Sequence, residues 1–188
     1  MIVTTLEAPA AEPVGLAETK EFLRIAGAGE DSLVTGLIAG ARARIEEAVG
    51  LALISRTLRV ALDAWPVAML SRRSMTLPVR PAGELAAVRV VQDGAAVDVI
   101  DRFSLATGRA ARLSWIAGAL PHHDARTQIE IDYVAGFGEA AGDVAESLRL
   151  AVKQLVAHAY QARGFDARGD LLPADVAALV APWRRVRL

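Results

Sequence analysis

Apolar residues recur at helical spacing through the first fifty residues of the chain. Residues 1–14 hold two prolines among alanines and are expected to form an extended arm. After this arm, apolar positions three and four residues apart predict a helix over residues 15–25 and a longer helix from Asp31 to Gly50. Asp31 is a suitable N-cap and Gly50 a suitable C-terminal stop. The sequence therefore predicts two amphipathic helices joined by a short loop.

Between residues 55 and 134 the pattern changes to a period of two, which is typical of half-buried strands. It is clearest over 57–63, where apolar and polar or small residues alternate. Glu130 and Asp132 alternate with isoleucines and are expected on the outer face of a strand. Asp93-Gly94 predicts a hairpin turn. Further short strands are expected at 75–77, 88–92, 97–100, 113–116 and 128–133, which together predict a small antiparallel sheet.

The helical pattern returns after residue 142. Asp143 and Glu146 resemble a capping box, apolar residues follow at helical spacing, and Gly164 is expected to end the helix. This order predicts an α+β fold, a helical bundle with an inserted small antiparallel β domain and an extended C-terminal tail. The expected parts are the arm 1–14, a helical pair 15–54, the β domain 55–138, a third bundle helix 139–165 and a C-terminal segment 166–188.

Composition narrows the classes of function. The chain has 188 residues and no cysteine, which excludes a disulfide scaffold, a thiolate zinc site and a cysteine nucleophile. Mean hydropathy is +0.32, yet no stretch approaches the roughly 20 apolar residues of a membrane span, and no secretion signal is recognised. We therefore expect no membrane association, a cytoplasmic location in the cell of synthesis, and surplus apolar surface that is covered in an oligomer.

Candidate chemical motifs are few and weak. Gly27-Ala28-Gly29 follows a predicted helix and lacks the third glycine of a dinucleotide fingerprint. His122, His123 and Asp124 lack a fourth metal ligand at a sensible spacing, and His158 is expected at the boundary of a helix. The sequence thus predicts no catalytic residue, no cofactor, no metal and no enzyme. Two alternatives stay open, a small enzyme with a site around His122–Asp124 and a DNA-binding regulator.

Charge is distributed unevenly along the chain. Residues 1–50 carry 4 basic and 8 acidic side chains, whereas residues 143–188 carry 7 basic and 5 acidic ones. The net charge of −1 argues against strong affinity for nucleic acid, and the asymmetry suggests docking between subunits or with partners. Near the end of the chain, Trp183 lies between Pro182 and three arginines, a combination typical of interface hot spots. Trp183 can equally fold back onto its own domain.

The ordered set of motifs resembles the head–tail connector, or adaptor, proteins of long-tailed phages, a group that includes the adaptors of gene transfer agents. The likeness covers about residues 14–188, and it includes Val134 and Phe137 where the family usually has Thr and Tyr. The segments that carry it are Leu16-x-x-x-Lys20-x-x-Leu23-Arg24-Ile25, the helix from Asp31 to Ile45-Glu46-x-x-Val49-Gly50, Arg56-Thr57-Leu58, Leu77-Pro78-x-x-Pro81, Tyr133-Val134-Ala135-Gly136-Phe137-Gly138 and His158-x-Tyr160-x-x-Arg163.

The resemblance implies a structural role in the neck of a phage or phage-like particle. A ring of about twelve copies is then expected beneath the portal protein, with DNA passing through its lumen without specific binding. A stopper or tail terminator protein is expected on the other side of the ring, and the polar segments Leu70–Ser74 and Ala119–Arg126 are candidates to face it. The C-terminal segment is expected to dock on the portal through Pro173, Leu179, Pro182, Trp183, Arg184, Arg185 and Arg187.

Overall fold

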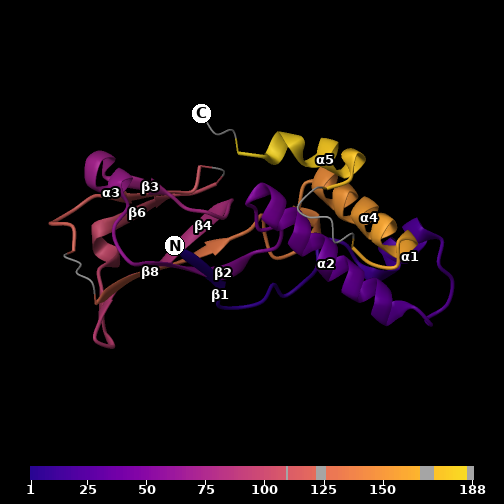
Figure 1. Ribbon diagram of the computed structural model, residues 1–188, viewed down its shortest axis with the longest axis horizontal. Helices are drawn as coiled ribbons and strands as arrows, with labels where there is room; N and C mark the ends of the chain where they lie inside the picture. The colour runs from indigo at the N-terminus through magenta and orange to yellow at the C-terminus, as the bar shows by residue number, and fades with distance from the viewer. Residues whose placement is uncertain (109, 122–125, 166–171, 186–188) are drawn as a thin grey trace. The chain divides into compact units, whose positions relative to one another are not determined.

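The computed structural model describes residues 1–108, 110–121, 126–165 and 172–185 and confirms the predicted α+β class (Figure 1). The chain divides into two compact units. The first, called here the β unit, comprises Met1–Pro9 and Ser55–Gly136, and the second, the helical unit, comprises Ala10–Ile54 and Phe137–Leu188. Each unit has strands or helices with their own buried side chains.

A five-stranded antiparallel sheet forms the larger part of the β unit. Its central strand, β8, lies between β2 and β4, with β1 and β5 at the two edges. The predicted alternation holds in β2 and β8, because Leu58, Val60, Ile129 and Ile131 are buried on one face. In order across the sheet the strands are β1 (Ile2–Thr5), β2 (Arg56–Leu62), β8 (Thr127–Ala135), β4 (Ala82–Gln92) and β5 (Ala95–Asp98).

The described part of the β unit also contains a three-stranded sheet and two short helical segments. The segment Leu70–Ser74, a candidate from the sequence to face the tail side, comprises the end of helix α3 and the start of β3. Trp65 stacks on Phe103 with ring centroids 5.3 Å apart, and both rings are buried. These elements are α3 (Val67–Arg72), β3 (Ser74–Thr76), the 3₁₀ turn η1 (Ile100–Arg102), β6 (Phe103–Ala106) and β7 (Arg112–Trp115).

The hairpin at Asp93-Gly94 is confirmed. It joins β4 to β5 as a two-residue loop, with Gln92 opposite Ala95. Asp93 and Gly94 have φ angles of 48° and 82°, and two consecutive positive φ values are what a type I′ turn requires.

The expected N-terminal arm is only partly an arm. Ile2–Thr5 form β1, which pairs with β2 along the edge of the five-stranded sheet. All four residues of β1 are exposed, so no alternation of buried and exposed positions marks the strand in the sequence.

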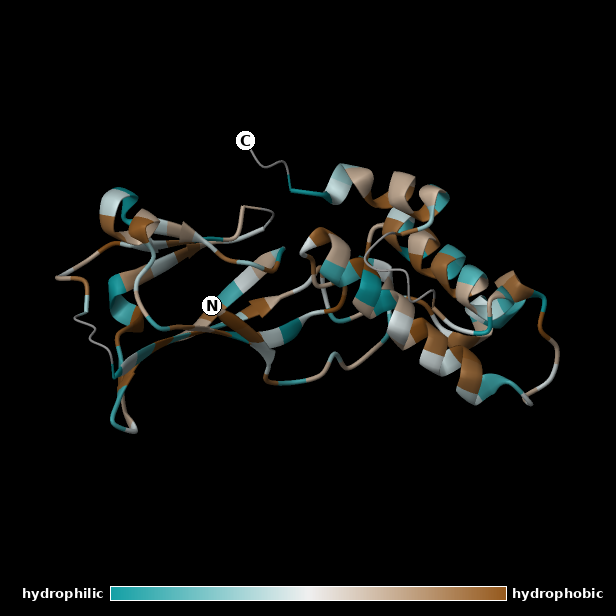
Figure 2. Cartoon of the chain, viewed as in Figure 1, coloured by the Kyte–Doolittle hydropathy of each residue, from teal (hydrophilic) through white to brown (hydrophobic). Residues whose placement is uncertain are grey.

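Among its described residues, the helical unit has four α-helices and two 3₁₀ turns. Helix α2 packs along α4, and α4 packs along α5 (Figure 1). Hydrophobic residues recur along α2 and α4 in Figure 2, and their inward-facing members, such as Ile45 and Leu148, are fully buried. The elements are α1 (Leu16–Leu23), α2 (Asp31–Val49), η2 (Ala141–Asp143), α4 (Glu146–Gln161), α5 (Ala174–Val180) and η3 (Ala181–Trp183).

Helix ends in this unit differ in part from the prediction. Gly50 ends α2 in the left-handed conformation, φ 65°, as expected. Asp31 is the first helical residue and not the N-cap, because its carboxylate pairs with Lys20 of α1. Asp143 lies in η2 and accepts a hydrogen bond from the Ala140 N–H at 2.9 Å, while α4 begins at Glu146. The predicted capping roles of Asp31 and Asp143 are therefore wrong.

Candidate partner-docking site

The segment predicted to dock on a partner begins with a helix that belongs to the helical unit. Val176 and Val180 of α5 are fully buried in the core of that unit. Pro173 is the N-cap residue of α5, where its fixed φ of −49° suits the entry into a helix. Leu179 is half-buried against the same core. Pro173 and Leu179 thus hold α5 in place, and the segment expected as an extended tail starts as packed structure.

Trp183 also folds back onto the helical unit. Its ring meets Phe137 edge-on, with centroids 5.3 Å apart and an interplanar angle of 85°. The indole N–H donates a hydrogen bond to Ser147 Oγ at 3.2 Å. The sequence allows Trp183 either to contact a partner or to fold back onto its own domain. In the structure the side chain packs at the edge of the core of the helical unit.

The exposed members of the predicted site lie around and after Trp183. Pro182, Arg184 and Arg185 are exposed, whereas Arg187 lies outside the described residues. Arg184 takes an extended conformation, with φ −64° and ψ 146°, so the helical segment ends at Trp183. The structure therefore separates the predicted set into residues that hold α5 in place and a short exposed basic segment, Arg184–Arg185.

A histidine–aspartate pair joins α5 to α4. His158 Nε2 lies 2.9 Å from Asp175 Oδ2, and both side chains are about half exposed. The hydrogen bond to His158 holds the pKa of the Asp175 carboxyl below its ordinary value, although burial opposes the shift. His158 is thus a boundary residue, as its place in the helical pattern predicts, and it helps to position the segment that carries Trp183.

The structure explains the residue type at three positions of the motif from Tyr133 to Gly138. The Tyr133 hydroxyl is buried, accepts a hydrogen bond from the Val79 N–H and donates one to the Val79 carbonyl, at 3.2 and 3.1 Å. Gly136 has a φ of 144°, which favours glycine. A Cβ on Gly138 would stand 2.2 Å from Asp143 Oδ2, so only glycine fits beside the turn that Asp143 closes.

Replacing Tyr133 with phenylalanine should lower the free energy of unfolding by about 1–2 kcal/mol, because both backbone groups of Val79 would lose a partner. Urea denaturation of the two proteins measures the difference. The other tyrosine, Tyr160, bonds Glu30 at the surface and is the matched control. An equal or larger effect of Tyr160→Phe would contradict a special role for the buried hydroxyl.

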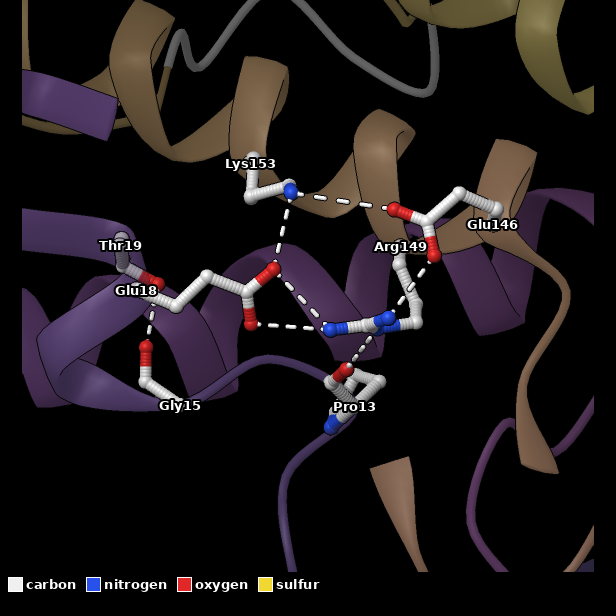
Figure 3. Close-up of polar contacts among 7 residues, drawn as sticks. All are labelled: Pro13, Gly15, Glu18, Thr19, Glu146, Arg149 and Lys153. Atoms are coloured by element: carbon white, nitrogen blue, oxygen red, sulfur yellow. Dashed lines mark hydrogen bonds and ion pairs between the residues drawn. The ribbon is translucent and has the colours of Figure 1, made fainter. Parts of the chain in front are cut away.

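Figure 3 shows that Glu18, an acidic residue near the start of the helical unit, is neutralised within the unit. Glu18 of α1 receives hydrogen bonds from Arg149 and Lys153 of α4, at 3.0 and 2.9 Å. The bond from Lys153 lowers the pKa of the Glu18 carboxyl, although burial opposes the shift. Arg149 also donates to the Pro13 carbonyl at 3.1 Å, which ties the chain before α1 to α4. At Glu18, therefore, the acidic start of the chain has its basic partner within the same unit.

Glu18→Gln should destabilise the protein by about 1 kcal/mol or less, since the Glu18 side chain is about a third exposed and salt screens such pairs. Denaturation at low and high salt measures both the loss and its screening. Glu21 is exposed on the same helix and gives the control, Glu21→Gln, for which no loss is expected. A salt-independent loss in Glu18→Gln would speak against the ion pair as its cause.

A charged network covers one face of the five-stranded sheet. Arg59 and Arg89 donate to the two carboxylate oxygens of Asp132 at 2.7 Å each, and Glu130 lies 2.9 Å from Arg59. Asp132 is buried, because the two arginine side chains lie over it. The sequence predicts the face on which Asp132 lies correctly, but its expected exposure is wrong.

Within the described residues, no three histidine, aspartate or glutamate side chains come together as ligands for a metal ion. His122, His123 and Asp124 lie outside those residues. The described segments also contain no helix that is long and apolar enough to cross a membrane.

Comparison with solved structures relates the whole chain to the necks of phage-like particles. No profile of a known protein family and no curated protein sequence matches it. A chain in the neck of an empty gene transfer agent (GTA) particle, computed with C6 symmetry, is 30% identical to this chain in sequence, with a TM-score of 0.84. A chain in the virion of a native gene transfer agent is 31% identical, also with a TM-score of 0.84. A chain in the neck of a native GTA particle, computed with C12 symmetry, is 30% identical with a TM-score of 0.76. In each case the match covers 100% of this chain and 97% of the other.

Likeness over the full length at this identity defines the class of protein, a structural component of the neck of a phage-like particle. Within that class, the chain belongs to the family of gene transfer agent neck proteins.

Proposed function

We propose that this protein is the head–tail adaptor of a gene transfer agent or related phage-like particle. About twelve copies would form a ring between the portal protein and a stopper or tail terminator protein, and the ring would continue the DNA channel. The observation that carries the proposal is the full-length match to chains of particle necks, one of them computed with C12 symmetry. A part of this kind needs no catalytic residue, so we infer a role without enzymatic activity.

The exposed basic segment at the end of the chain is the proposed contact with the portal. Arg184 and Arg185 project beyond Trp183, which anchors the segment on the helical unit. Arg187 continues the same basic sequence. Guanidinium groups bind carboxylates in a bidentate way, so the portal surface is expected to be acidic there. In this proposal Trp183 anchors the segment internally, and the exposed arginines after it contact the portal.

The opposite side of the ring would meet the stopper or tail terminator. The end of α3 supports this proposal, since Leu70 and Arg72 are exposed there, and Val67 on the same helix is 77% exposed. Exposed apolar residues close to an arginine are a suitable composition for a protein interface.

A ring that continues the DNA channel should bind DNA only weakly, because the DNA must slide through its lumen. Each phosphate that a protein neutralises releases counterions and strengthens binding. The net charge of −1, with basic residues such as Arg59 and Arg89 neutralised by acids within the chain, gives little basis for such binding.

Negative-stain imaging of the protein with the portal protein of the same genome tests the proposal. We expect a ring of about twelve subunits, with the rotational order of the portal, on one end of the portal. The protein alone is an insufficient test, because assembly can require the portal as a template. A protein that stays monomeric beside assembled portals, and is absent from purified particles, would overturn the proposed function.

A further inference from the structure

Both edges of the five-stranded sheet are open, and they match one another. At one edge lies β1, with the sequence Ile-Val-Thr-Thr, and at the other lies β5, with the sequence Ala-Ala-Val-Asp. Each strand has four residues, and all eight are exposed. Exposed edges are templates for further strands, and β1 has no lysine, proline or bulge of the kind that blocks such pairing.

The backbone groups of the two edges have the same spacing. The Leu6 N–H donates to the Thr57 carbonyl, so the alternation of an antiparallel pair directs the N–H and C=O of Val3 and Thr5 away from β2. At the other edge the Val99 N–H donates to the Val88 carbonyl, and the same rule directs the groups of Ala96 and Asp98 outward. Each edge therefore offers two residues, two positions apart, for a new ladder.

The side chains of the two edges match as well. Val3 lies opposite Val60, and Val97 lies opposite Val90, whose partner in β8 is Ile129. Val3 and Val97 thus belong to the face of the sheet on which Val60 and Ile129 are buried, yet they are 40% and 62% exposed. A strand added at either edge would extend the covered face and bury these two valines.

The direction of the strands fits a head-to-tail contact. Because the five strands alternate in direction, β1 and β5 run the same way. Two copies in the same orientation would therefore place β5 of one copy parallel to β1 of the next, which is an allowed ladder. A contact between two different edges is heterologous and closes into a ring when it is repeated by a rotation.

We propose that β1 of one copy pairs with β5 of the neighbouring copy, so that the five-stranded sheets join into one sheet around the ring. The occupant of each edge is thus a second copy of this chain. The inference rests on the proposed function for the ring, and it names the strands that form the contact. It also accounts for the apolar residues left exposed at the two edges.

Cross-linking in assembled particles tests the contact directly, since the natural chain has no cysteine to interfere. Val3→Cys and Val97→Cys are introduced together, and purified particles are treated with a short bismaleimide, whose reach tolerates a two-residue slip in register. We expect a ladder of covalent oligomers on a denaturing gel from the double variant only. A dimer from Val3→Cys alone would overturn the proposal in favour of a symmetric β1–β1 contact.

The two proposals fail in different ways. Particles that contain the double variant but give no ladder would overturn the edge contact and leave the adaptor function standing. Particles that lack the protein altogether would overturn the adaptor function, and the edge contact with it.

A charged residue at the edge gives a second, independent readout. Val97→Lys should leave the fold unchanged, since Val97 is exposed, but should lower the yield of tailed particles at least tenfold, because lysine on an edge strand opposes pairing. The matched control is Leu33→Lys, a similarly exposed residue on α2 of the helical unit. Equal yields from Val97→Lys and the natural protein would contradict the contact.

Discussion

Reversing two charges, Arg184→Glu with Arg185→Glu, should strongly weaken docking on the portal while the protein stays folded. Both side chains are exposed and lie beyond Trp183, so their replacement leaves the core of the helical unit untouched. Each reversal would replace an attraction by a repulsion against the acidic portal surface that we propose. Together they should cost about 3 kcal/mol of binding free energy, which is about a hundredfold in affinity. Binding to purified portal, with the yield of tailed particles as a second readout, measures the loss.

A control with the same change in net charge separates a local contact from a general electrostatic effect. Arg24→Glu with Arg163→Glu places the same charges on exposed positions elsewhere in the helical unit. We expect this variant to bind the portal nearly as the natural protein does. Equal losses in the two double variants would show that net charge, and not the end of the chain, controls docking.

Trp183 requires a separate experiment, because the structure gives it an internal role. Removing residues 182–188 would delete the basic segment together with the contact between Trp183 and Phe137. Trp183→Ala should therefore lower the free energy of unfolding by about 2 kcal/mol, less than the 3–5 kcal/mol typical of a fully buried tryptophan. A loss of portal binding in Trp183→Ala with unchanged stability would assign the side chain directly to the partner interface.

The correct and the wrong sequence predictions have different physical causes. Alternation identifies β2 and β8 because each strand buries one face, whereas β1 is exposed throughout and leaves no such signal. Propensity favours Asp31 as a helix cap, but Lys20 from the preceding helix takes its carboxylate. Local sequence patterns predict the structure correctly where burial is periodic along an element or where a turn is short. They fail where a tertiary partner competes for the same side chain.

The same distinction applies to the candidate site. The basic sequence after Trp183 is visible in the chain, since three arginines occur without an acid among them. The anchoring of Trp183 depends on Phe137 and Ser147, which are distant in sequence, and no local pattern specifies that contact. Likewise, Asp132 has the spacing of an exposed residue, and only the pairing of β2 and β4 with β8 brings two arginines over it.

Asp132→Asn should be among the most destabilising single changes in the β unit. The Asp132 side chain is 6% exposed and accepts hydrogen bonds from both Arg59 and Arg89. Removing its charge would leave two guanidinium groups without their shared partner. Breaking a fully buried pair costs about 3–5 kcal/mol, and because both arginines stay about a third exposed we expect about 2–3 kcal/mol. Glu130→Gln, which affects Arg59 alone, is the matched control and should cost less.

The pH dependence of Asp132→Asn distinguishes an electrostatic loss from a packing defect. Burial alone would raise the pKa of the Asp132 carboxyl, but the bonds from Arg59 and Arg89 outweigh it and hold the pKa below 3.8. The carboxylate therefore stabilises the folded protein above that ordinary value, and the contribution is lost as the pH falls through the lower pKa of the folded state. The difference in unfolding free energy between the natural protein and Asp132→Asn should be constant near neutral pH and shrink below about pH 4. A difference that persists unchanged at pH 3 would mean that packing around the side chain, and not its charge, holds β2, β8 and β4 together at this point.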